Sequence, residues 1–284
     1  MKNYLIGAVA IFLTTTSVQA GCPKFEEIDA IVAAYQAKLP IKPIENLRTI
    51  LEAYCAQGKL AAQIGRIKGA QAGFKAGYTS LSTRSGTDVD RPLRGFLFQN
   101  MFLKDGSVIS ANFGARPRYA ADLIAVAKDD DLNTAVTSLD ALAHISHFLP
   151  FIDLSDLIVE EGASTDMYNL IATNIGSRWG VLGKPIPVEV TEEFLARLAA
   201  MTIVMEDEKG EIIGRGKGSD VLGHPMNSVL WIVRDLAHSA QRVQQGDKLG
   251  VGAFIPAGTP QAGRGVKVTY QGLPGDPTVS VRFE

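Results

Sequence analysis

Three side chains that could bind a metal follow one another at helical spacing near the middle of the sequence. Asp140, His144 and His147 are four and then three residues apart, so they share one face if the segment is helical. Two imidazoles and one carboxylate are a ligand set that zinc accepts. The alternative is that these are solvated side chains on a helix surface, and the sequence leaves both interpretations open.

The two cysteines of the chain, Cys22 and Cys55, are a second candidate for chemistry. The segment before them predicts export, because an apolar run over 5–13 leads to the small-residue sequence Val-Gln-Ala at 18–20, as in a secretory signal peptide. We therefore expect a secreted, periplasmic protein. Thiols tend to pair in such an oxidising compartment, which predicts a Cys22–Cys55 disulfide. An unpaired, buried Cys55 is the alternative.

Length and composition exclude several classes of function. The chain has 284 residues, with 28 Lys and Arg against 30 Asp and Glu and a net charge of -2, so it lacks the basic surface of a general nucleic-acid binder. Behind the signal peptide no apolar segment approaches the ~20 residues that a membrane-spanning helix needs. The sequence lacks the G-x-S-x-G motif that is typical of serine hydrolases. The glycines of 214–218 fit no phosphate-binding pattern. We expect neither a nucleic-acid partner nor a membrane anchor after signal cleavage.

The periodicity of apolar residues predicts an α+β protein. Helical spacing over 28–39 and 44–60 indicates two helices behind the signal peptide. From residue 73 onward, short apolar runs separated by Gly, Asp and Pro are typical of strands, and one further helix is predicted to begin at Pro225. We therefore divide the chain into a signal peptide (1–20), a helical N-terminal section (21–72) and one α+β domain (73–284).

Four short segments, spread over nearly the whole mature chain, share their order and spacing with a known family. They are Gly-Phe-Lys-Ala-Gly-Tyr-Thr-Ser at 73–80, the segment 171–183 with Asn174 and Ser177, Gly-Arg-Gly at 214–216 followed by 221–227, and Val-Ser-Val-Arg-Phe at 279–283. Together they resemble the fumarylacetoacetate hydrolase superfamily, specifically its 2-keto-4-pentenoate hydratase and 4-oxalocrotonate decarboxylase branch. The resemblance implies a mixed β-roll with flanking helices that assembles as a homo-oligomer.

The resemblance also implies a metal-dependent reaction. In this family three carboxylates hold a divalent cation, commonly magnesium or manganese, which binds a 2-oxo acid and stabilises its enolate. The family stretch P-R-x-E-x-E reads Pro-Arg-Tyr-Ala-Ala-Asp here, so its ligand positions hold Ala120 and Asp122. The family stretch E-x-x-D is matched to 150–153, which places Pro150 at the third ligand position. We therefore predict a degraded metal site in which Asp122 is a vestigial ligand.

Three further residues are implied to be catalytic by the resemblance. Lys75 corresponds to a family lysine beside the substrate, where it binds a carboxylate or moves a proton. Ser177 would donate a hydrogen bond to a substrate oxygen, and His224 would take a chemical role. The alternatives are a structural salt bridge for Lys75, a local cap for Ser177 and a helix-packing role for His224.

Substrate contacts are expected from two places. Thr79 and Ser80 belong to the same motif as Lys75. The family stretch Q-P-D-Y-G reads Arg-Pro-Leu-Arg-Gly here, so its acid is replaced by a leucine between Arg91 and Arg94. A guanidinium can grip the carboxylate of a 2-oxo acid with two hydrogen bonds in place of a metal. Solvated surface arginines are the alternative.

Two functions are compatible with these residues. The first is a hydratase/decarboxylase-like lyase that acts on a small 2-oxo or 2-hydroxydienoic acid despite the degraded metal site. The second is a non-catalytic periplasmic binding protein that keeps the pocket for small carboxylic acids and has lost the chemistry. The substituted ligands favour the second function, whereas the retained motif around Lys75 favours the first.

Overall fold

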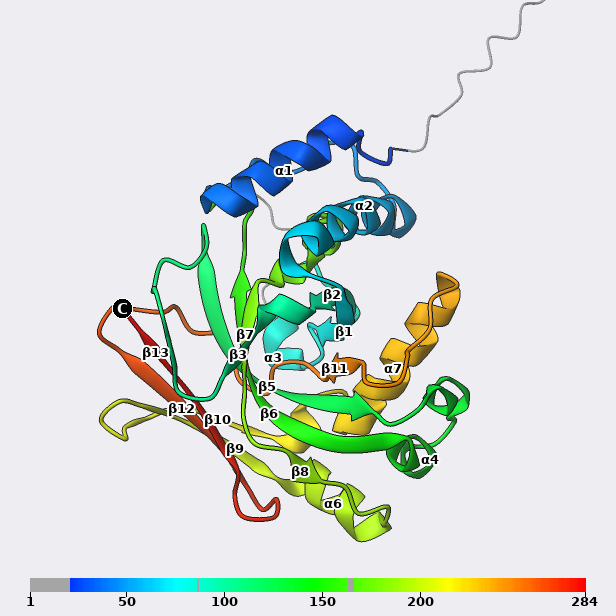
Figure 1. Cartoon of the computed structure of the whole chain (residues 1–284), viewed down its shortest axis with the longest axis vertical. Helices are drawn as coiled ribbons and strands as arrows, with labels where there is room; N and C mark the ends of the chain where they lie inside the picture. The colour runs from blue at the N-terminus through cyan, green and yellow to red at the C-terminus, as the bar shows by residue number, and fades with distance from the viewer. Residues whose placement is uncertain (1–20, 86, 163–165) are drawn as a thin grey trace, which may run out of the picture.

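Two sheets form the framework of the protein, and the larger one carries the residues of interest (Figure 1). The computed structural model describes residues 21–85, 87–162 and 166–284, so the predicted signal peptide lies outside the described residues. The larger sheet has the order β2-β1-β11-β5-β6-β7-β3, with β8 paired to β6. Its strands are β1 (Gln71–Gly77), β2 (Leu93–Phe98), β3 (Phe102–Lys104), β5 (Pro117–Ala127), β6 (Ile145–Asp156), β7 (Trp179–Leu182), β8 (Ile186–Pro187) and β11 (Lys248–Gly250).

The second sheet has five strands in the order β10-β9-β12-β13-β4. They are β4 (Ser107–Ile109), β9 (Thr202–Asp207), β10 (Ile212–Lys217), β12 (Gly265–Gln271) and β13 (Thr278–Phe283). Both sheets mix parallel with antiparallel pairs: β1 runs parallel to β11, and β13 runs parallel to β4. The predicted α+β class and mixed β-roll are confirmed.

Tyr270 of β12 ties the two sheets together. Its side chain is fully buried. The phenol oxygen donates to the backbone carbonyl of Asp122 on β5 and accepts the backbone N–H of Phe151 on β6 at 3.2 Å. These hydrogen bonds therefore hold β5 and β6, the central strand pair of the larger sheet, against the second sheet.

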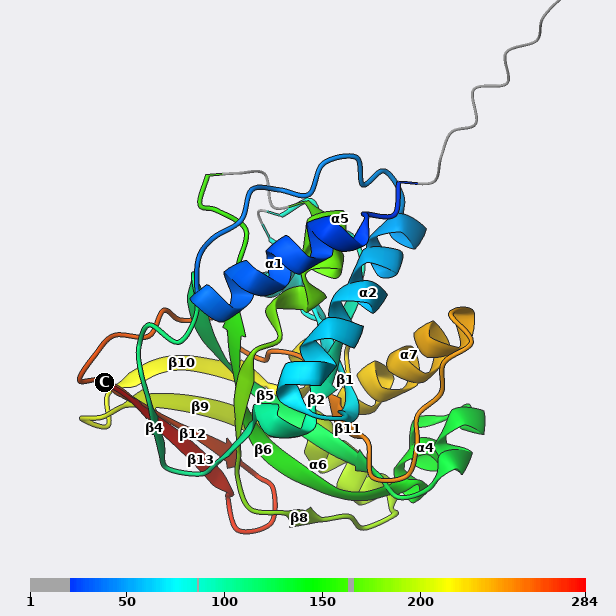
Figure 2. The same ribbon diagram turned by 45° about the horizontal axis from the view of Figure 1, so that its top comes forward.

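The longer helices lie outside the sheets, and the described residues include α1 (Phe25–Ala37), α2 (Ile50–Lys68), α6 (Glu192–Ala200) and α7 (Pro225–His238). Figure 2 shows α1 and α2 side by side at one end of the molecule, with α2 next to β1 and β2. The shorter helices are α3 (Leu81–Arg84), α4 (Ser138–Ala143) and α5 (Met167–Ala172), with short 3₁₀ turns η1 (Gln99–Met101), η2 (Asp130–Thr134), η3 (Asn174–Gly176) and η4 (Gly218–Asp220). None of the described helices combines the length and the apolar character that a membrane crossing requires.

The second predicted helix begins six residues later than its apolar pattern suggested. The helix begins after Thr49, which is its N-cap residue. The Thr49 hydroxyl accepts the N–H of Glu52, and the Glu52 carboxylate accepts the N–H of Thr49, which together form a capping box. At the other end Gly69, with φ of 82°, follows the last helical residue. The cap residues therefore decide the helix boundaries, rather than the apolar stripe.

The predicted disulfide is present and confirmed. Cys22 and Cys55 are bonded, with their Cα atoms 5.7 Å apart. The backbone N–H of Gly21 also donates to the Glu52 carboxylate at 2.8 Å. The beginning of the described chain is thus attached to α2 in two places.

Of the two interpretations left open for Asp140, His144 and His147, the structure does not support the zinc set on one helical face, because the helix ends too early. Helix α4 stops at Ala143, and β6 begins at Ile145, so His147 lies in a strand. Asp140 accepts the N–H of Val136. The Nδ1 atom of His147 lies 3.0 Å from the Ser146 hydroxyl. The three side chains therefore do not share one face.

Candidate active site

A cleft of about 240 Å³ opens at the ends of β1, β5 and β6, where the described residues bring several charged side chains together. The cleft is formed by the β1 motif, α3, the β5–β6 pair with the residue that follows it, η3 and the loop after β11. The lining residues are Lys75, Ala76, Gly77, Tyr78, Ser82, Thr83, Arg118, Ala120, Asp122, Asp153, Ser155, Leu157, Ile175, Ala253, Pro256 and Ala257.

Lys75 lies at the base of this cleft. Its position on β1 is opposite Gly95 of β2 on one side and Gly250 of β11 on the other. A Cβ atom on Gly250 would lie 2.9 Å from the Lys75 Cβ, so this close strand approach requires the glycine. The Lys75 side chain is 3% exposed, and its ammonium lies 2.8 Å from the Oδ2 atom of Asp153. The sequence therefore singled out a residue that lines the cleft.

Asp122 is a second buried carboxyl group of the cleft, on β5. Its Oδ1 atom accepts the backbone N–H groups of Leu123 at 2.6 Å and Gly252 at 2.9 Å. The residue is 2% exposed. Burial, together with the nearby charge of Asp153, raises the pKa of Asp122 to about 7. A carboxyl group with this pKa can both hold and release a proton near neutral pH.

Asp153 of β6, and not Pro150, faces the position where the third family ligand was expected. In the antiparallel β5–β6 ladder Asp153 is directly opposite Ala120, and such partners point to the same face of a sheet. Pro150 is three residues away and points to the other face, where it packs close to Gly183. The match of 150–153 to the family stretch was wrong by three residues.

The signal that could have placed Asp153 is present in the sequence. Asp153 and Asp156 have the same acid-x-x-acid spacing as the family stretch E-x-x-D. Asp156 then forms a buried ion pair with Arg178 at 3.1 Å, away from the cleft. The prediction of a single remaining carboxylate is therefore corrected: the cleft holds two, Asp122 and Asp153.

Arg118 is a cleft residue that the sequence reasoning did not single out, although it belongs to the family stretch. It follows Pro117 at the start of β5 and is half-buried. Its Nη1 atom donates to the carbonyl of Pro117 at 2.9 Å. Among the described residues, no carboxylate lies within ion-pair distance of this guanidinium. Arg118 is thus available to bind an anion in the cleft.

The other predicted catalytic residues lie elsewhere. His224 caps α7: its Nδ1 atom accepts the N–H of Met226 at 3.0 Å, and its Nε2 atom lies 2.9 Å from the carbonyl of Leu195. Both ring nitrogens thus have structural partners. Ser177 follows the short turn η3, where its buried hydroxyl lines a small cavity beside Asp156 instead of the Lys75 cleft.

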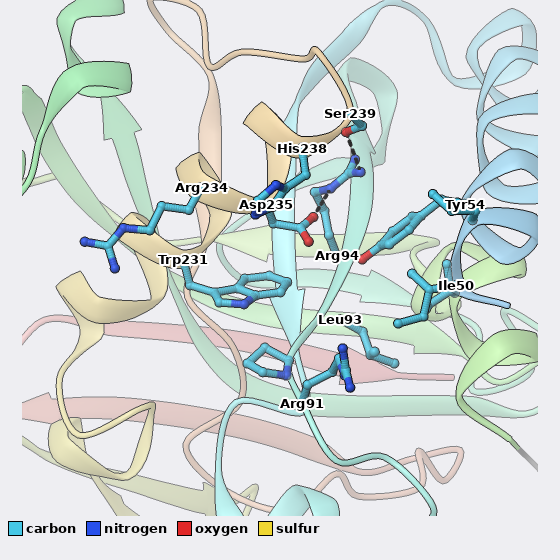
Figure 3. A pocket seen from close by; sticks show the side chains of 13 residues that line it. Ile50, Tyr54, Arg91, Leu93, Arg94, Trp231, Arg234, Asp235, His238 and Ser239 are labelled. Atoms are coloured by element: carbon cyan, nitrogen blue, oxygen red, sulfur yellow. Dashed lines mark hydrogen bonds and ion pairs between the residues drawn. The ribbon is translucent and has the colours of Figure 1, made fainter.

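Arg91 and Arg94 line a different pocket, which Figure 3 shows between α2, β2 and α7. Arg94 is opposite Ala76 in the β1–β2 ladder, whereas Lys75 is opposite Gly95, so alternation along the strand turns Arg94 away from the Lys75 face. Its guanidinium is bound by Asp235 at 2.7 Å, Gln241 at 3.0 Å and Ser239 at 3.3 Å. The structure does not bring these arginines to the cleft.

One group of metal-ligating atoms does gather among the described residues, at the surface. Ligand atoms of Asp129, Asp131 and His144 lie within 4.8 Å of one another. The group is also explained without an ion, because Asp129 caps η2 by accepting the N–H of Asp131 and lies 2.7 Å from the Nδ1 atom of His144. Nothing else at this position points to a ligand.

Comparison with known proteins gives a consistent set of relatives. No family model matches the chain. The sequence is 27% identical to a 4-oxalocrotonate decarboxylase from Pseudomonas putida over 236 residues, which cover 83% of this chain and 86% of the relative. It is 29% identical to 2-keto-4-pentenoate hydratase 1 from Dechloromonas aromatica over 202 residues, which cover 71% of this chain and 74% of the relative.

Solved structures agree with the sequence relatives. The 4-oxalocrotonate decarboxylase from Pseudomonas putida G7, complexed with magnesium and adipate, superposes with a TM-score of 0.80 at 25% identity and covers 92% of this chain and 97% of its own. A fumarylpyruvate hydrolase from Pseudomonas aeruginosa, at 15% identity and a TM-score of 0.55 over 76% of this chain and 90% of its own, shares the fold. These relatives and structural neighbours support the assignment of the chain to the fumarylacetoacetate hydrolase superfamily, in the branch of the 2-keto-4-pentenoate hydratases and 4-oxalocrotonate decarboxylases.

Proposed function

We propose that this protein is a hydratase/decarboxylase-like lyase that acts on a small 2-oxo or 2-hydroxydienoic acid in the Lys75 cleft. The observation that carries the proposal is the juxtaposition in one cleft of the Lys75–Asp153 pair, the buried Asp122 and Arg118, which forms no ion pair with the described residues. The relatives named for lyase activities support the same class of reaction.

The cleft supplies the groups that such a reaction needs. Arg118 binds the substrate carboxylate with paired hydrogen bonds, and the Lys75 ammonium stabilises negative charge on the ketone or enol oxygen. Hydration of a dienol moves the enol proton to the far end of the conjugated chain. Water then adds across the remaining double bond, with its hydroxyl on the carbon distant from the ketone and its proton on the near carbon. Asp122 holds and returns the proton in these steps.

We further propose that a divalent cation is held weakly and is not needed for binding the acid. Ala120 offers no oxygen at the first family ligand position. One of the two remaining carboxylates, Asp153, is neutralised by Lys75, and Asp122 already accepts two backbone N–H groups. This donor set does not fit a cation held by three carboxylates.

Turnover of 2-hydroxypenta-2,4-dienoate in the presence of a chelator tests the lyase proposal, with loss of the ultraviolet absorbance of the conjugated diene as the readout. We expect Asp122→Asn and Lys75→Ala to lower kcat/KM by at least about a hundredfold, the range of general acid–base catalysis. Asp88→Asn, at an exposed position outside the cleft, is the matched control. No turnover by the wild type on either dienoates or 2-oxo diacids would contradict the proposal.

The non-catalytic binding protein gains no support, because the relatives reported above are named as enzymes. Export to the periplasm is also proposed, and the Cys22–Cys55 disulfide supports an oxidising compartment. A homo-oligomer is proposed from the family resemblance alone. Fractionation of cells that express the full chain tests export to the periplasm. Light scattering of the purified protein tests the oligomeric state.

A further inference from the structure

A pocket of about 460 Å³ lies between α2, β2 and α7 (Figure 3). It is separate from the Lys75 cleft, because no residue lines both spaces. All the groups that we assign to the proposed reaction lie in the cleft. The pocket between α2 and α7 therefore has no part in that reaction, although it is large enough for a small organic molecule.

Aromatic and aliphatic side chains form the walls of this pocket. Figure 3 shows Trp231 on the α7 side and Tyr54 on the α2 side. Leu93 and Ile50 add aliphatic surface, and Leu51, which also lines the pocket, is 82% exposed. Concave, mostly apolar surface of this kind is typical of sites for small ligands, so the walls favour a ligand with an apolar body.

The two opposite charges between these walls neutralise each other. The Arg94 guanidinium lies 2.7 Å from the carboxylate of Asp235, and its other two nitrogens donate to Gln241 and Ser239. Its Cζ atom also lies 4.8 Å from the centre of the Tyr54 ring. Every nitrogen of this guanidinium thus has a partner. Arg94 and Asp235 shape the pocket without leaving a net charge in it.

Arg91 supplies the charge that a ligand can reach. Its Nε and Nη2 atoms donate to Asp90 at 2.8 Å and 3.1 Å, and the two side chains are 55% and 66% exposed. An exposed pair of this kind is weak, and it leaves the Nη1 edge of the guanidinium open. Arg234 adds a second positive charge, since its guanidinium has no carboxylate within ion-pair distance among the residues that the structure describes. The mouth of the pocket therefore favours an anion.

We propose that this pocket is a second ligand site, which binds a monocarboxylate with an aromatic body. The carboxylate pairs with the open edge of the Arg91 guanidinium, whose planar group matches it with two hydrogen bonds. The aromatic ring lies against the Trp231 indole and Leu93, because aromatic rings pack favourably on one another. A dicarboxylate fits less well, since its second charge would be buried against apolar walls.

Calorimetric titration of the full chain with 4-phenylbutanoate and with its uncharged amide, 4-phenylbutanamide, tests the proposal. We expect the wild type to bind the acid at least about tenfold more tightly than the amide, because only the acid forms charge-assisted hydrogen bonds. Arg91→Gln should remove this preference. Trp231→Leu should weaken the binding of both ligands at least about fivefold. Arg242→Gln, at an exposed position outside the pocket, is the matched control for the loss of a positive charge.

A variant of the cleft separates the two sites. Arg118→Gln should bind 4-phenylbutanoate as the wild type does. A loss of affinity in Arg118→Gln but not in Arg91→Gln would place the ligand in the Lys75 cleft and overturn the proposal. Absence of binding to the wild type, or equal affinity for the acid and the amide, would overturn it as well. None of these measurements depends on turnover, so they leave the proposed function to its own test.

The same variants distinguish a small ligand from a second copy of the chain. If copies of the protein met at this pocket, Trp231→Leu would lower the molecular mass that light scattering measures, and the proposal would be wrong. We expect the mass to be unchanged. Arg91 is exposed, so its variant should fold normally, and circular dichroism of both variants checks this.

Discussion

Ala120 and Asp153 face each other directly across the β5–β6 ladder, on the same face of the larger sheet. A methyl group therefore lies where an acidic side chain would stand beside both Asp153 and Asp122. The ammonium of Lys75 lies 2.8 Å from Asp153 and neutralises the charge of this carboxylate, one of the two that remain. The loss of an acid at position 120 thus leaves the cleft with less negative charge than a three-carboxylate site would have.

Restoring this acid should restore cation binding. We expect Ala120→Glu to bind Mn²⁺ at least about tenfold more tightly than the wild type, because three carboxylates then share one face and hard oxygen ligands suit this ion. Calorimetric titration with MnCl₂ measures the change.

Ala257→Glu is the matched control for this experiment, since it adds the same charge at an exposed position of the cleft rim. An equal gain in both variants would show only a general electrostatic effect. No gain in Ala120→Glu that remains folded by circular dichroism would contradict the assignment of this position.

Small carboxylates should stabilise the folded protein through Lys75 and Arg118. A ligand that binds only the folded state raises the melting temperature by mass action, so oxalate or pyruvate should raise it in the wild type even with a chelator present. We expect Lys75→Ala and Arg118→Gln to abolish the shift, measured by differential scanning fluorimetry. An undiminished shift in both variants would exclude them from the binding site and leave Lys75 with its salt bridge to Asp153 alone.

The sequence predicted the fold and Lys75 because both are determined by local patterns. The glycines around Lys75 permit the close approach of β11, and the motif order is preserved along the chain. The third acid was misplaced because strand register is a property of two segments together. A shift of three residues exchanges the two faces of β6, so only the pairing with β5 distinguishes Asp153 from Pro150.

Arg94 and His144 show the same limit. The guanidinium of Arg94 is directed by strand alternation toward Asp235 on α7, which is 141 residues away in the sequence. His144 leaves its predicted helix because the chain must enter β6 at Ile145. The spacing of residues along the chain reveals neither the pairing of Arg94 with Asp235 nor the start of β6 at Ile145, because tertiary contacts determine both.

The cap of α7 should make stability depend on pH. Burial lowers the pKa of His224, although its bond with the Leu195 carbonyl acts in the opposite direction. Only the neutral ring can accept the N–H of Met226 at Nδ1. The unfolded state therefore binds a proton more readily, and this contribution to stability is complete above about pH 6.5 and is lost as the pH falls below it. His224→Asn keeps a capping acceptor without titrating.

We expect the free energy of unfolding of the wild type to fall relative to His224→Asn as the pH decreases from about 7.5 to about 5. Urea denaturation at a series of pH values measures this difference. Asp122 contributes with the opposite sign, because its raised pKa lowers stability as the pH rises toward about 7, and the comparison between variants removes that common contribution. A constant difference between the two proteins would show that His224 does not titrate in the folded cap.

The disulfide should account for much of the stability of the N-terminal helices. Cys22 and Cys55 close a loop of about 34 residues, for which the chain-entropy model gives about 3.5 to 4 kcal/mol. The double variant Cys22→Ser, Cys55→Ser should lose stability of this order in urea denaturation, and reductant should lower the stability of the wild type by the same amount without affecting the variant. The two substitutions leave unchanged Gly21 and Glu52, whose hydrogen bond is the second attachment of this segment to α2. The side chain of Gln57 on α2 donates to the buried carbonyls of Arg94 and Ile171, and these bonds hold α2 on the rest of the protein without the disulfide. We therefore expect faster proteolysis of the variant to begin before α2. A variant as stable as the wild type would mean that packing alone holds the helices in place.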